Sequence, residues 1–149
     1  MPFSDDWIEV EVTVDSGACD TVMPLRSCAF KILPSYQSKL GLEYEVANGE
    51  SIPNLGEKRM TMCTNETSTQ RNLTMQVAEV NRALLSVAKM VDAGNRVVFD
   101  KDWSFIEDLR TGERSTIQRR GGLYILETWV KARRSEGAPP PAPFQRQGR

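Results

Sequence analysis

The residues best suited to chemistry are Asp15, Ser16 and Gly17, which directly follow a run rich in β-branched residues from Ile8 to Val14. Such a run predicts a strand, and Asp, Ser and Gly favour a tight turn at its end. A second apolar stretch, Val22 to Pro24, begins soon afterwards. We therefore expect the Asp15 carboxylate to lie partly buried on a rigid scaffold, where an unpaired charge is costly.

Bringing two such turns together would reduce the cost of burying the charge, because two carboxylates about 3 Å apart share one proton. One then acts as general base on a water molecule, and the other protonates the carbonyl of a peptide bond. Ser16 could orient the carboxylate through its hydroxyl, and Gly17 would let two backbones approach closely. The chain contains one such turn, so the second carboxylate must come from a second copy, with the two-fold axis between two Asp15 residues. On these residues alone, an ordinary turn without chemistry remains open.

The composition removes several classes of site. There is no histidine, which excludes Ser-His-Asp triads, Cys-His pairs and histidine-containing zinc sites. The cysteines Cys19, Cys28 and Cys63 have no C-x-x-C spacing, and we expect reduced thiols, with Cys19 buried by default. We therefore expect no metal and no cofactor. The net charge of −1 gives no reason to expect a membrane or nucleic acid as the main partner.

We expect residues 1–134 to form one domain and residues 135–149, which are rich in proline, to form a disordered tail or linker. The basic residues of this tail could bind nucleic acid weakly through phosphates. The first residues lack the basic and apolar regions of a signal peptide, and no apolar stretch approaches the roughly 20 residues of a membrane span. The expected location is therefore cytoplasmic or nuclear.

Most segments predict strands, and the expected fold class is mostly β. Asn48-Gly49 lies between two alternating segments and predicts a hairpin with a type I′ turn. Leu84 to Val91 predicts one short amphipathic helix, with Asn81 as a candidate cap and Gly94 as its stop. Further strands are expected at 7–14, 58–63, 73–80, 97–99, 103–109, 115–118 and 123–130, and a turn or short helix is expected between Pro24 and Pro34.

Four motifs in order resemble one protein family. Val14-Asp-Ser-Gly-Ala18, followed by an apolar stretch, looks like the active-site loop of the retroviral-type aspartic proteases. Tyr44 to Ile52 resembles their flap as retrotransposon polyproteins carry it. Leu84 to Gly94 is similar to the stretch after the flap in copia-type polyproteins, and Gly121 to Leu126 resembles the strand that closes this region. The resemblance covers roughly residues 7 to 130.

The resemblance implies a single-lobed, retropepsin-like closed β-sheet domain with one short helix and extra C-terminal strands. It implies an aspartic endopeptidase that works as a homodimer on peptide or polyprotein substrates. Asp15 would be the catalytic carboxylate, and Ser16 and Gly17 would shape its loop. The flap tip would comprise Ala47, Asn48, Gly49 and Glu50.

Two positions depart from the family pattern. Ser86 stands where a glycine is expected before the helix, and fourteen residues precede Asp15, so the first strand of the dimer sheet looks shortened. Two alternatives remain open. One is a decayed or domesticated protease-like fold that acts as a binding or structural module; the other is a nucleic-acid accessory domain, which the low net charge disfavours.

Overall fold

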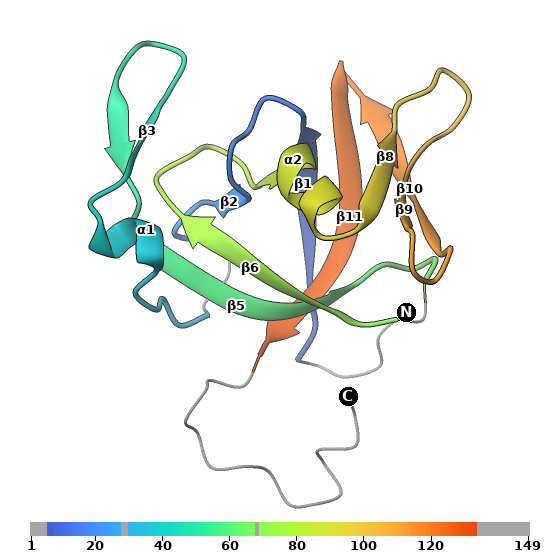
Figure 1. The fold of residues 1–149 in the computed structure, drawn as a ribbon, viewed down its shortest axis with the longest axis horizontal. Helices are drawn as coiled ribbons and strands as arrows, with labels where there is room; N and C mark the ends of the chain where they lie inside the picture. Colours follow the sequence, from blue (N-terminus) through green and yellow to red (C-terminus); the bar gives the residue numbers. More distant parts are fainter. Residues whose placement is uncertain (1–5, 28–29, 68, 134–149) are drawn as a thin grey trace, which may run out of the picture.

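The computed structural model describes residues 6–27, 30–67 and 69–133, which form a mostly β structure with two short helices (Figure 1). The proposed tail at 135–149 and Cys28 lie outside the described residues. The elements, in chain order, are β1 (Ile8–Asp15), β2 (Val22–Met23), α1 (Tyr36–Lys39), β3 (Glu43–Glu45), β4 (Ser51–Pro53), β5 (Gly56–Cys63), β6 (Arg71–Val77), β7 (Leu84–Ser86), α2 (Val87–Asp92), β8 (Asn95–Val98), β9 (Ser104–Asp108), β10 (Arg114–Arg120) and β11 (Leu123–Ala132).

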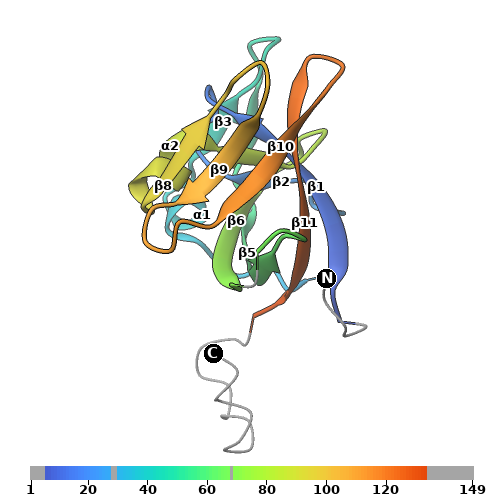
Figure 2. The same ribbon diagram turned by 90° about the vertical axis from the view of Figure 1, so that its right-hand side faces the viewer.

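Nine of these strands form one mixed sheet in the order β1-β7-β2-β6-β5-β11-β10-β9-β8. The sheet curls back on itself, because β1 also pairs with β11. Strands β8 to β11 and β1 form one wall (Figure 2). The pairs β1–β7 and β2–β6 are parallel, and the other pairs are antiparallel. The mostly β fold class expected from the sequence is confirmed.

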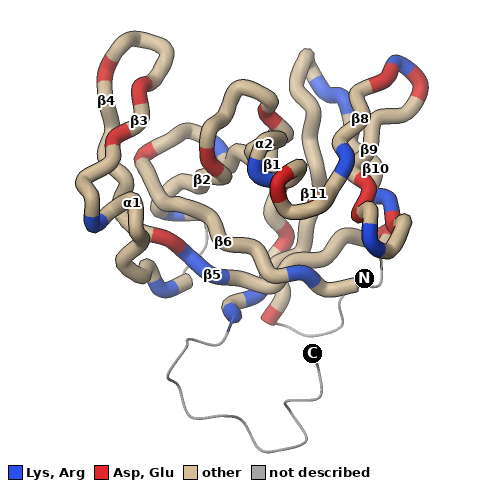
Figure 3. Tube along the Cα trace, viewed as in Figure 1, with Lys and Arg blue, Asp and Glu red and all other residues tan. Residues whose placement is uncertain are grey.

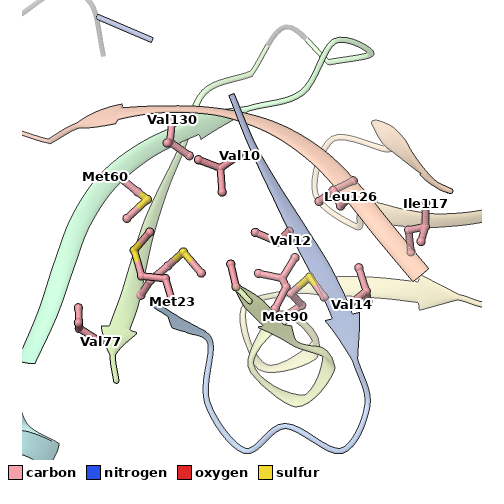
Figure 4. Close-up of a cluster of buried hydrophobic side chains, with 13 residues drawn as sticks. Val10, Val12, Val14, Met23, Met60, Val77, Met90, Ile117, Leu126 and Val130 are labelled. Carbon is pink, nitrogen blue, oxygen red and sulfur yellow. The ribbon is translucent and has the colours of Figure 1, made fainter. Parts of the chain in front are cut away.

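The core forms where alternate residues of β1 point inward. Val10, Val12 and Val14 are buried, whereas Glu9, which precedes them, and Glu11, which lies between Val10 and Val12, are exposed. The three valines pack in one cluster with methionines, including Met23 and Met60, which are fully buried (Figure 4). Burying one such apolar side chain contributes about 1.5–3 kcal/mol. The cluster therefore fixes the strand whose last residue is Asp15.

Strand β1 finds a second partner on β11, which lies in the interior of the sheet order. Six residues of β1, from Ile8 to Thr13, pair antiparallel with Ile125 to Val130. The Thr128 hydroxyl adds a buried hydrogen bond of 2.7 Å to the Val10 carbonyl. Strand β1 is thus paired with β11 along most of its length.

The expectation of a single helix, with Asn81 as its cap, is wrong. Helix α2 begins at Val87 and is capped by Ser86, because Leu84 and Leu85 are held in a parallel pairing with β1 before the helix can start. Helix α1 was not expected. It begins just after Pro34, with a capping box in which Ser35 and Ser38 bond each other's backbone amides.

None of the helices in the described part of the chain is both long and apolar enough to span a membrane.

Candidate active site

The Asp15 carboxylate lies at the end of β1, half-buried, at the start of the turn that leads to β2. The backbone amide of Gly17 donates a hydrogen bond of 2.8 Å to its Oδ1 atom. The contact expected from the Ser16 hydroxyl is therefore made by the next residue's backbone. Ser16 itself is exposed. One carboxylate oxygen is thus fixed by the turn.

Neither the backbone conformation nor the described surroundings of Gly17 require a glycine at this position. Its φ is outside the left-handed region, and a Cβ at this position would lie 3.4 Å from Asp15 Oδ1, an ordinary contact. The residues that the structure describes therefore leave room for a larger side chain at this position.

Ser86 braces the turn from behind. Its backbone pairs with Asp15 across the parallel β1–β7 ladder, and its side chain is fully buried. The hydroxyl donates to the Ala18 carbonyl at 2.8 Å and accepts from the Lys89 amide at 3.2 Å. The Ser86 amide in turn donates to Thr21 Oγ1 at 3.1 Å. The serine that departs from the family pattern therefore ties the turn, β7 and α2 together.

The second half of the loop is held by β6 and α2. The Thr21 carbonyl accepts from the Gln76 amide at 2.8 Å, which joins β2 to β6. Asp20 is 8 % exposed, and its carboxylate accepts a hydrogen bond from the Tyr44 hydroxyl at 2.8 Å. The Lys89 ammonium lies 3.6 Å from the other Asp20 oxygen. Asp20 is thus a partnered acid, whereas Asp15 accepts from a backbone amide.

The predicted hairpin forms, with Tyr44 opposite Ile52 in β3 and β4. Its turn differs from the expected type I′, since only Gly49 of the pair has a positive φ, of 85°. The Gly49 amide donates to the Val46 carbonyl at 2.9 Å, and the Val46 amide donates to Glu50. This is a three-residue loop with glycine in the left-handed position. Gly49 therefore has a conformational role at the tip.

The hairpin and the Asp15 turn project from the same side of the sheet, at the top of Figure 1. Figure 3 shows acidic but no basic residues on the hairpin, which carries Glu43, Glu45 and Glu50. The structure joins the two parts at the hairpin base, through Tyr44 and Asp20, while Ala47 to Glu50 are exposed.

A pocket of about 370 Å³ lies beneath α2, between β6 and the β9–β10 pair. Asp20 and Thr21 contribute to one end of it, whereas Asp15 does not line it. Its apolar wall consists of Met62, Leu73, Leu85, Met90, Ile106 and Leu126. This pocket therefore lies beside the Asp15 turn and is separate from its carboxylate.

Cys19 is exposed, which corrects the expectation of a buried thiol, because it lies in the loop where the chain leaves the core. Cys63 is buried, and this burial raises the pKa of its thiol. The described residues contain no cluster of three potential metal ligands.

Sequence reasoning found Asp15, its turn and the hairpin, but it missed the side chains that connect them. Ser86 carried a usable signal, because serine directly before a helical segment is a preferred N-cap. Tyr44 and Asn54 carried none, since their contacts join residues far apart in the chain.

Comparisons of this chain with protein-family models, with curated proteins and with solved structures gave no match.

Proposed function

We propose that this chain is an aspartic endopeptidase with a retropepsin-like fold, which hydrolyses peptide bonds of a polyprotein as a homodimer. The observation that carries the proposal is the half-buried Asp15 carboxylate at a strand end, fixed by the Gly17 amide and braced by Ser86. The four-motif resemblance supports the same function. In this proposal, a second chain brings its own Asp15 to the first across a two-fold axis.

The chemistry follows from the shared proton of the two carboxylates. The ionised carboxylate takes a proton from water while the water oxygen attacks the peptide carbonyl carbon. The protonated carboxyl gives its proton to the carbonyl oxygen, which forms a tetrahedral diol. Proton transfer to the nitrogen then breaks the C–N bond. No metal or cofactor is required in this scheme.

The other elements have supporting roles in this proposal. Ser16 and Gly17 shape the turn, and Gly17 leaves room for the second chain's turn. Ala47, Asn48, Gly49 and Glu50 form the tip of a flap that closes over the bound peptide and excludes water. The partnered state of Asp20 suits a structural role and leaves Asp15 as the reacting acid.

The decisive variant is Asp15→Asn, assayed on a mixture of peptides with products identified by mass spectrometry. We expect cleavage to be abolished with the fold intact, because an amide cannot act as the base. Asp92→Asn, at an exposed position on α2, is the matched control and should cleave normally. Wild-type turnover should be highest on the acid side of neutral pH, since the acid role requires the shared proton.

Mixing wild-type and Asp15→Asn chains tests the dimer. In an equimolar mixture that exchanges freely, about half of the wild-type chains pair with a variant chain, so activity per wild-type chain falls to about half. Activity that is unchanged by mixing would refute a shared site. A dimer that cleaves no peptide at any pH would instead favour the domesticated binding module.

A further inference from the structure

Tyr44 joins the hairpin to the loop that carries Asp15. It lies on β3, and its hydroxyl donates to Asp20 Oδ2 at 2.8 Å. Asp20 is buried five residues after Asp15 and is also approached by Lys89 of α2. Burial and the Asp20 carboxylate raise the pKa of Tyr44 well above its ordinary value. The hydroxyl therefore remains a donor at any pH at which the protein would work.

Asn54 completes the anchor from the other leg of the hairpin. It is buried at 6 % exposure, directly after β4, and its amide nitrogen donates to the Tyr44 hydroxyl and to Gln76, both at 2.9 Å. Its amide oxygen accepts from Ser35 and from the Gly56 amide. The two hydrogen bonds that it donates and the two that it accepts use the full hydrogen-bonding capacity of a side-chain amide. The base of the hairpin is thus fixed by one buried polar network.

The rest of the hairpin has no comparable support among the described residues. Strands β3 and β4 form a separate two-stranded sheet of three residue pairs, outside the nine-stranded sheet. A two-stranded hairpin of this size is marginal by itself in water. Its direction relative to the body is therefore set at its base.

We infer that Tyr44 is a positioning residue, whose hydrogen bond to Asp20 holds the hairpin in a fixed position and direction relative to the Asp15 turn. The inference rests on the proposed function where it concerns peptide closure, but the position of the hairpin can be measured without any cleavage. Loss of the hydroxyl leaves Asp20 and Asn54 each without one partner, and the hairpin is then free to swing about its base.

The test is a distance measurement by pulsed electron paramagnetic resonance. Spin labels are attached to ketone-bearing unnatural amino acids at Ala47, on the hairpin tip, and at Lys101, an exposed residue of the β8–β9 loop. This chemistry leaves the native cysteines untouched, and dilution with unlabelled chains removes distances between copies. Tyr44→Phe is compared with Tyr36→Phe, the same change at an exposed tyrosine of α1.

We expect Tyr44→Phe to broaden and shift the distance distribution and Tyr36→Phe to leave it unchanged. Asp20→Leu, which removes the acceptor and keeps the branching at Cγ, should give the same broadening, and the double variant should be no broader. A narrow, unshifted distribution in Tyr44→Phe would overturn the inference. So would a double variant whose broadening is the sum of the two.

Peptide cleavage provides the second readout. A hydrogen bond to a charged group stabilises the arrangement that it holds, so we expect its loss in Tyr44→Phe to lower kcat/KM roughly tenfold. Tyr36→Phe should change kcat/KM little. If no form cleaves peptide but Tyr44→Phe still broadens the distribution, the proposed function fails and the positioning role stands. If wild-type cleaves and both readouts are unchanged in Tyr44→Phe, the positioning role fails and the proposed function stands.

Discussion

Replacing Ser86 by alanine tests whether the turn is held from behind. The hydroxyl caps α2 through the Lys89 amide and satisfies the Ala18 carbonyl. Loss of an N-cap costs about 1 kcal/mol, and leaving the part-buried Ala18 carbonyl without its donor costs roughly a further 1–3 kcal/mol. The Ser86 amide keeps its bond to Thr21, and removal of one oxygen leaves almost no cavity. We therefore expect the free energy of unfolding to fall by roughly 2–4 kcal/mol.

The assay is equilibrium unfolding in urea at one fixed protein concentration, because the stability of a dimer depends on concentration. Ser51→Ala, at an exposed position on β4, is the matched control and should change the unfolding free energy by less than about 0.5 kcal/mol. Turnover per folded chain should also fall in Ser86→Ala, because the Ala18 carbonyl is released from its anchor. A loss of stability below about 0.5 kcal/mol would refute the bracing role.

Two further changes test the tip of the hairpin and the charge network. Gly49→Val is expected to strain the turn by about 1–2 kcal/mol, because φ at this position is 85°, although the space around it is open. The variant should slow cleavage more than it lowers the stability of the domain. Gly49→Asn is the control, because asparagine tolerates this backbone region, and a loss of stability without a catalytic effect would contradict the flap assignment. Arg71 holds the pKa of the Asp108 carboxyl below its usual range, so this carboxylate stabilises the fold above its ordinary pKa, and the contribution disappears as pH falls through the lowered value. Asp108→Asn should therefore be less stable than wild type near pH 7. In urea titrations at several pH values, the difference should shrink as pH falls below about 3.9 and vanish only below the lowered pKa; a difference independent of pH would contradict this reasoning.

Local patterns predicted much of the fold. The alternation in β1 and the Asn-Gly pair of the hairpin acted over a few residues, and both elements formed where expected. The helix was misplaced because the apolar period of Leu84 and Leu85 suits a helix and a buried strand equally, and pairing with β1 decided between them. Helix α1 has four residues, too few to give a periodic signal.

The candidate site divides in the same way. Asp15 could be found because a carboxylate after an apolar strand is visible locally. The contacts of Tyr44 could not, since Asp20 lies 24 residues away and Gln76 lies 22 residues from Asn54. A single sequence carries no signal for a hydrogen bond between such distant polar side chains, because each of them is equally plausible as a solvated residue.

The pairing of β1 with β11 has a consequence for synthesis. Thr128 reaches Val10 across 118 positions of sequence, so the strand that ends at Asp15 cannot be completed until almost the whole of the described chain has left the ribosome. Such distant pairings are entropically expensive and slow folding. The strand that ends at Asp15 is thus among the last elements to close, and the Asp15 turn has its full support only once β11 is in place.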